Sequence, residues 1–149
     1  MTAPVITTER LVLRMPEASD EPHFCAFLMS DRAKYVGGPA TRGRAWRAFA
    51  HLVGQWEMRG YGVLVIERQD TGAVIGSCGF FHPAELDEPE ISWSIWDESA
   101  EGQGFALEAA LASCMSLYKP VPVRDGDGKV VGAVYPNDLA KASLQTDAA

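Results

Sequence analysis

The chain has 149 residues, which suits one domain and is too short for two full ones. A hydrophobic fraction of 47% and a charged fraction of 22% are typical of a globular protein and argue against disorder. The net charge of −7 disfavours nucleic acid as a partner, because phosphate binding needs a basic surface. A cationic substrate such as an amine would instead be attracted.

The patterns of cysteine, histidine and hydropathy further limit the kinds of site and the cellular location that we expect. Cys25, Cys78 and Cys114 lie far apart and form no CxxC pair, so we expect reduced thiols. The three histidines are isolated from one another and from the cysteines, and they predict no metal site. No run has the pattern of a signal peptide or the roughly 20 apolar residues of a membrane span. We therefore expect a soluble, cytoplasmic protein with no membrane partner.

The first part of the chain predicts one strand and two helices. Leu11–Arg14 is a short apolar run typical of a strand. Ser19-Asp20 is a helix cap, and the apolar residues after it recur at helical spacing as far as Met29. A second helix begins after Thr41, follows the 3.6-residue period and ends at Gly60.

The middle of the chain changes to a strand pattern. Tyr61–Glu67 and Ala73–Phe81 flank a turn and predict an antiparallel hairpin. Glu90–Trp96 predicts another strand, and the Ala-rich run Phe105–Leu117 predicts a helix. No long crossover links these strands. We expect an α+β fold with a mixed, mainly antiparallel central sheet flanked by helices.

The composition shifts at about Tyr118. An extended run, a tight Asp125–Gly128 turn and the run Val130–Val134 predict a hairpin, and Asn137 is a cap for a short last helix. Residues 1–117 would then form the core, and residues 118–149 an atypical hairpin and helix that complete the same sheet. An uncovered strand edge favours aggregation, so pairing is expected, and a homodimer that shares the hairpin is the alternative.

The link between the Glu90–Trp96 strand and the next helix carries the chemistry. Gly102 and Gly104 stand directly before the helix, where the first N–H groups lack partners inside it. The helix dipole adds partial positive charge at this end, and glycines let the backbone approach a bulky anion. The pattern favours a phosphate or pyrophosphate, and a simple turn is the alternative.

The strand Glu90–Trp96 with the run Ala100–Ala109 resembles the central motif of the GCN5-related N-acetyltransferases (GNAT), closest to the ribosomal-protein N-acetyltransferase branch. That family opens this helix with Arg/Gln-x-x-Gly-x-Gly/Ala, and the matching positions here are Glu101, Gly104 and Ala106. Glu101 departs from the usual Arg or Gln.

Two further runs agree with this resemblance. Thr8–Arg14 is similar to the opening strand of that branch, and Gly76–Gly79 to its third strand. The resemblance covers about residues 5–117.

The resemblance implies acetyl-CoA as co-substrate and a primary amine as acceptor, on a small molecule or a protein N-terminus. Ile95 and Trp96 would present backbone groups to the pantetheine arm, where the strand splays from its neighbour. Pyrophosphate would be held by the loop beginning at Glu101, through the N–H groups of Gly102, Gln103, Gly104, Phe105 and Ala106.

Acyl transfer needs a neutral amine, so a general base is expected. Glu90 starts the strand and is the first candidate, with a solvent-facing carboxylate as the alternative. His82 is a weaker candidate that could equally be structural. The tryptophans could line an acceptor pocket or belong to the core: Trp46, Trp56, Trp93 and Trp96.

The family's later elements, including an Asn and a Tyr or Ser acid, are not recognisable after Leu117. Instead, the tail is similar to the second half of a cystathionine-β-synthase (CBS) domain, with Asp138 at its ribose-binding position and Tyr135 replacing Thr or Ser. Three hypotheses follow: an active N-acetyltransferase, a non-catalytic acyl-CoA or adenine-nucleotide-binding module, and a structural or interaction domain.

Overall fold

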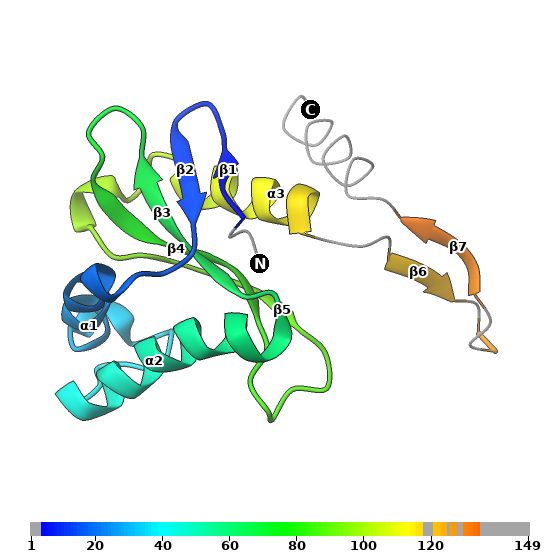
Figure 1. The fold of residues 1–149 in the computed structure, drawn as a ribbon, viewed down its shortest axis with the longest axis horizontal. Coiled ribbons are helices and arrows are strands. Elements are labelled where there is room, and N and C mark those ends of the chain that lie inside the picture. The colour runs from blue at the N-terminus through cyan, green and yellow to red at the C-terminus, as the bar shows by residue number, and fades with distance from the viewer. Residues whose placement is uncertain (1–3, 118–120, 125, 128–129, 135–149) are drawn as a thin grey trace.

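The computed structural model describes residues 4–117, 121–124, 126–127 and 130–134. Five strands form one antiparallel sheet in the order β1-β2-β3-β4-β5. Three α-helices pack on it, so the predicted α+β class is confirmed (Figure 1). None of the helices in the described part of the chain is both long and apolar enough to span a bilayer.

The strands form a simple meander in which each new strand pairs with the one before it. Their bounds are β1 Ile6–Thr7, β2 Leu11–Arg14, β3 Val63–Arg68, β4 Val74–Phe81 and β5 Glu90–Ile95. Four of the five match predicted strands. β1 was not predicted, because two residues are too few to show a period, and it exists through its pairing with Val12 and Leu13.

Three α-helices cover the two faces of the sheet: α1 Glu21–Leu28, α2 Arg42–Arg59 and α3 Phe105–Leu117. Thr41 caps α2 by accepting a hydrogen bond from the Arg44 N–H, and Gly60 ends it in the left-handed conformation at φ 73°. Three short 3-10 turns add to the predicted elements: Ala18–Asp20, Asp31–Ala33 and Glu98–Ala100.

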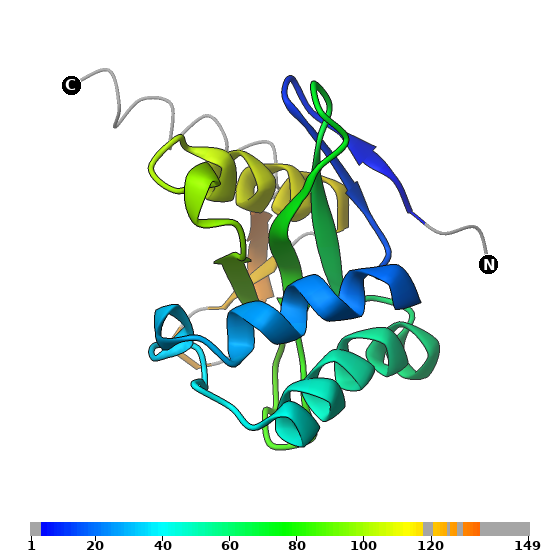
Figure 2. The same cartoon turned by 90° about the vertical axis from the view of Figure 1, so that its left-hand side faces the viewer.

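Helices cover both faces of the sheet (Figures 1 and 2), and the apolar core has one part on each face. Helices α1 and α2 pack on one face, where Phe24, Phe49 and Trp96 form edge and tilted ring contacts. Helix α3 packs on the other face, where Phe105 and Ala109 meet buried aliphatic residues of β2, β3 and β4. The strand β5 and its loop therefore lie between two helical layers.

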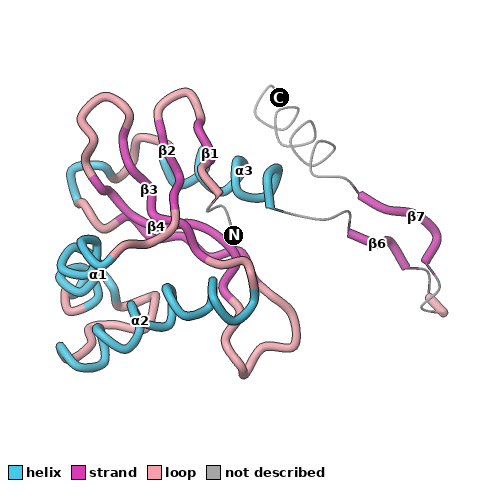
Figure 3. The backbone as a smooth tube through the Cα atoms, viewed as in Figure 1, coloured by secondary structure: helices cyan, strands magenta, loops and turns pink. Residues whose placement is uncertain are grey.

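The predicted C-terminal hairpin is present as β6 Val121–Arg124 and β7 Val130–Val134. These strands pair with each other in a separate two-stranded sheet, drawn apart from the five-stranded sheet in Figure 3. Completion of the central sheet by this hairpin is not a feature of this structure and stays a prediction. Tyr135, Asn137, Asp138 and the predicted last helix lie outside the described residues.

Candidate active site

The loop between β5 and α3 has two glycines with positive φ directly before the helix. Gly102 and Gly104 adopt the left-handed region at φ 72° and 79°. The first hydrogen bond of α3 runs from the Glu108 N–H to the Gly104 carbonyl at 3.1 Å. The N–H groups of residues 105–107 therefore precede the helix's own ladder and face the loop end.

The space beside Gly102 and Gly104 is open. A Cβ atom built at Gly102 would meet nothing within 4 Å, and one at Gly104 would meet only the Arg10 guanidinium, at 3.6 Å. Open space next to exposed N–H groups at a helix start is the arrangement that receives phosphate groups.

Arg10, in the turn between β1 and β2, holds this loop in place. Its guanidinium donates to the Gln103 carbonyl at 2.9 Å and to Glu108 at 2.7 Å, and lies 4.3 Å from the centre of the Phe105 ring. Glu108 also accepts hydrogen bonds from the Thr8 hydroxyl and the Arg10 N–H. Burial of Glu108 opposes ionisation, but these hydrogen bonds outweigh it and lower the pKa of its carboxyl.

A second arginine compensates for the unusual acid at the start of the loop. Arg32, in the turn after α1, forms an ion pair with Glu101. Its guanidinium also donates to the carbonyls of Trp96 at 2.7 Å and Ile95 at 3.0 Å. Ile95 and Trp96, whose backbone groups are predicted to face the pantetheine arm, thus have their carbonyls already engaged, and the charge of Glu101 is neutralised.

β5 is an edge strand of the described sheet, with β4 on one side only. The Trp96 N–H donates to the Ile75 carbonyl at 2.7 Å, and the β4–β5 register places Ser94 opposite Ser77. Because N–H and C=O directions alternate along a strand, the backbone groups of Ile91, Trp93 and Ile95 point away from β4. This outward edge is the surface along which an extended ligand could bind.

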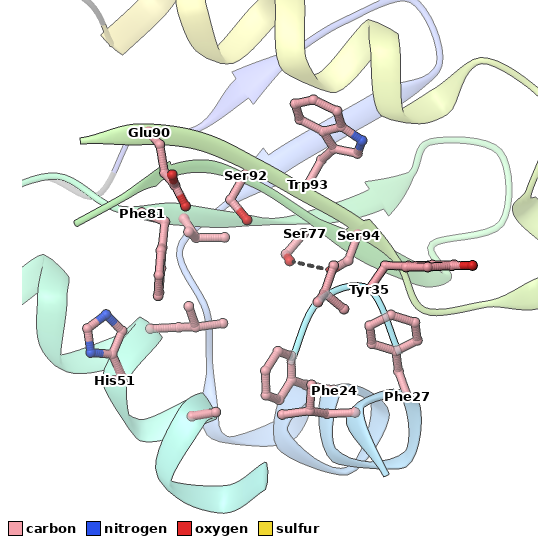
Figure 4. A pocket seen from close by; sticks show the side chains of 15 residues that line it. Phe24, Phe27, Tyr35, His51, Ser77, Phe81, Glu90, Ser92, Trp93 and Ser94 are labelled. Carbon is pink, nitrogen blue, oxygen red and sulfur yellow. Dashed lines mark hydrogen bonds between the residues drawn. The ribbon is translucent and has the colours of Figure 1, made fainter. Parts of the chain in front are cut away.

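A cavity of about 390 Å³ lies between β5 and helices α1 and α2 (Figure 4). Phe24 and Phe27 rise from α1, and His51 and Phe81 close another side with their rings 5.1 Å apart. Ser77 and Ser94 face each other across the strands, with their hydroxyl oxygens 3.2 Å apart. Tyr35 and Trp93 also line it, so α1, α2, the turn after α1 and β5 all contribute.

Of the predicted base candidates, Glu90 lines this cavity and His82 does not. The His82 ring is hydrogen-bonded to the Tyr61 hydroxyl and, at 3.0 Å, to the Leu86 carbonyl, so it holds the β4–β5 loop. His51 was not predicted to belong to the site. Its Nε2 is buried with no hydrogen-bond partner among the described residues, and its signal in the sequence was only its position on the inner face of a helix.

The four tryptophans have different environments. Trp93 lines the cavity and is 51% exposed, whereas Trp46 is exposed away from it. Trp56 is buried and donates to the Val63 carbonyl at 2.8 Å, and Trp96 is buried against Phe24. Only Trp93 among them joins the candidate acceptor cavity.

Solved structures share this fold. An acetyltransferase from Agrobacterium tumefaciens matches at 37% identity with a TM-score of 0.71, over 76% of this chain and 66% of that one. A GNAT-family acetyltransferase from Bordetella pertussis matches at 25% identity with a TM-score of 0.61, over 73% and 69% of the two chains. RimL, an alpha-N-protein acetyltransferase of a ribosomal protein, matches at 18% identity with a TM-score of 0.55, over 79% and 66%, which shows a common fold alone.

This chain thus spans about two thirds of the length of these structures. A comparison with curated proteins finds no match. A family model for the acetyltransferase (GNAT) domain matches residues 10–143, which includes most of the C-terminal tail. The likeness of that tail to a CBS domain is not supported by these matches and stays a prediction. The chain belongs to the GNAT acetyltransferase family.

Proposed function

We propose that this protein transfers an acetyl group from acetyl-CoA to a primary amine of a small molecule or a protein N-terminus. The observation that carries the proposal is the loop Glu101–Ala106, with two left-handed glycines and open space before the first N–H groups of α3. In this proposal the loop holds the pyrophosphate, as helix N-termini hold phosphate groups elsewhere.

The pantetheine arm would follow the outward edge of β5 toward the cavity. Arg32 occupies the carbonyls of Ile95 and Trp96, which leaves the Ile95 N–H and the groups of Trp93 for the arm. The Trp93 N–H, beside the cavity, is the candidate donor to the thioester oxygen as negative charge develops on it. This modifies the sequence-based assignment, in which Ile95 and Trp96 alone faced the arm.

The amine would approach from the cavity. Its nitrogen would bond to the acetyl carbon, the carbon–sulfur bond would break, and CoA would leave as the thiolate, which takes up a proton from solvent. Glu90, exposed and at the cavity wall, is the candidate acceptor of the amine's proton.

Direct transfer is favoured over an acyl-enzyme on cysteine. Burial raises the pKa of Cys78 to about 12 and that of Cys25 to about 11, and it also raises the pKa of Cys114. The thiolate is the nucleophilic form, so none of the three is activated at neutral pH.

Replacing Glu90 with glutamine tests the base. We expect kcat to fall about 100-fold or more, the low end of general-base effects, with acetyl-CoA affinity unchanged. Glu88→Gln is the matched control, because Glu88 is exposed in the preceding turn and does not line the cavity. Equal kcat values for the two variants would remove Glu90 from the mechanism.

A second candidate is a non-catalytic acyl-CoA or adenine-nucleotide-binding module. The observation that favours it is the free edge of β5, which no further strand covers in the described sheet. Calorimetry with acetyl-CoA, followed by a thiol-release assay with amines, separates the two. Binding without thiol release from any amine would select the module.

A further inference from the structure

We infer that the acceptor is a small amine with a single positive charge and an apolar, preferably aromatic, body. The inference rests on the proposed acetyltransferase function and concerns the cavity between β5 and helices α1 and α2. Its volume of about 390 Å³ lies at the lower end of the range of small-molecule pockets. That size suits a compact amine.

The charge of the cavity limits the number of ammonium groups that it can accept. Among the 15 described residues that line it, Glu90 is the one with a carboxylate, and no Lys or Arg is among them. A buried charge needs a partner, so one ammonium can pair with Glu90 while a second or third would be desolvated without compensation. The Lys34 ammonium, 4.9 Å from the Tyr35 ring centre, adds positive charge beside the cavity and would repel further ammonium groups.

The walls suit an apolar body. Phe24, Phe27, Leu28 and Leu52 are buried members of the core that also line the cavity. The hydroxyl groups of Ser77 and Ser94 bond to each other, so the neutral polar side chains left on these walls are few, chiefly Ser92 and His51. A polyol or a sugar amine that entered the cavity would therefore lose more hydrogen bonds to water than the cavity could replace.

The mouth carries aromatic groups that the free protein leaves in water. Tyr35 is 86% exposed and Trp93 is 51% exposed, and both line the cavity. Figure 4 places Tyr35 close to the Phe27 ring, whereas the Trp93 side chain lies on the other side of β5, toward α3. An exposed aromatic side chain beside an apolar hollow marks a binding surface, and Tyr35 would stack on a ring carried by the amine.

Direct binding in the presence of CoA tests the inference without requiring turnover. The probes are 2-phenylethylamine, the triamine spermidine and a short peptide with a free N-terminus, each titrated by calorimetry. We expect 2-phenylethylamine to bind at least about tenfold more tightly than either of the others. Preferred binding of spermidine or the peptide, or no amine binding at millimolar concentration, would overturn the inference.

Variants at the mouth sharpen the test. Tyr35→Ala should weaken 2-phenylethylamine binding by about 2- to 12-fold, the value of one aromatic contact. Tyr35→Glu should improve binding of 1,5-diaminopentane by about 2- to 5-fold through a second ion pair. Met58→Ala is the control, since Met58 is 87% exposed on α2 and does not line the cavity. Identical amine affinities in Tyr35→Ala and Met58→Ala would contradict the assignment.

A failure of the proposed function would give a different experimental result from a failure of the acceptor inference. Acetyl-CoA that does not bind the unaltered protein would refute the cofactor loop and the acyltransferase proposal together. Acetyl-CoA that binds normally, with an amine preference other than the expected one, would refute only the acceptor class.

Discussion

Replacing Arg32 with alanine should weaken acetyl-CoA binding by about 5- to 30-fold. The guanidinium donates to two carbonyls at 2.7 and 3.0 Å and pairs with Glu101 at the start of the pyrophosphate loop. A hydrogen bond to a charged group contributes about 1.5–3 kcal/mol. The side chains of Arg32 and Glu101 are 26% and 53% exposed, so water compensates in part, and we expect a loss of about 1–2 kcal/mol. Each 1.4 kcal/mol corresponds to a tenfold change in Kd.

The loss has an electrostatic component that a second substitution should reverse. Without Arg32, the Glu101 carboxylate would face the pyrophosphate with its charge unneutralised. Arg32→Ala with Glu101→Gln should therefore bind acetyl-CoA more tightly than Arg32→Ala alone. Arg59→Ala is the control for a general loss of positive charge, because Arg59 is exposed at the end of α2.

Calorimetry at low and high salt measures these affinities, and the difference between the single and double variants should shrink at high salt. The reasoning is refuted if Arg32→Ala binds like Arg59→Ala, or if removing the charge of Glu101 recovers nothing.

Three other substitutions test the loop and its supports. Gly104→Val should greatly weaken acetyl-CoA binding, because a β-branched residue resists the left-handed backbone at φ 79°. Gly60→Val is the control, since it imposes similar strain at φ 73° away from the loop. Equal acetyl-CoA affinity in the two variants would exclude the loop as the site. Glu108→Ala should lower the free energy of unfolding by about 1–3 kcal/mol, measured with urea, because it leaves the part-buried Thr8 hydroxyl without its 2.7 Å acceptor. Burial of Asp20 opposes ionisation, but hydrogen bonds from Arg14 and the Glu17 N–H lower its pKa. Its stabilisation is therefore full above about pH 4 and is lost as the pH falls toward the lower folded-state pKa. Asp20→Asn should reduce the fall in the free energy of unfolding below about pH 4. An unchanged fall would contradict the role of the Asp20 carboxylate in acid stability.

Local signals predicted most of the fold. The helix Arg42–Arg59 has its cap at Thr41 and its left-handed glycine at Gly60, as the sequence indicated, because capping depends on a few neighbouring residues. The same holds for α3, whose bounds match the prediction. The strand Ile6–Thr7 was missed because its structure depends on pairing and not on its own pattern.

The site was only partly predictable, for a related reason. The glycines at 102 and 104 are a local signal, and the structure places both at positive φ. Arg10 and Arg32 could not be found this way, because their partners Glu108 and Glu101 lie 98 and 69 residues away in the sequence. His82 was a reasonable candidate at the end of a strand, but its ring is engaged by Tyr61 and Leu86.

Arg32 also affects how the free edge of β5 can be used. A strand that paired along this edge would need the outward Ile95 carbonyl as a hydrogen-bond acceptor, and Arg32 already donates to it. The loop end of β5 is therefore protected against strand addition, as natural proteins protect exposed edges. The outward groups of Ile91 remain available further along the strand, beyond the Trp93 groups proposed for the pantetheine arm. A strand added from the chain's own tail or from a second copy would have to pair there, which keeps the loop end open for the pantetheine arm. Arg32 thus has two roles in the proposed site: it neutralises Glu101, and it keeps β5 accessible where the cofactor would enter.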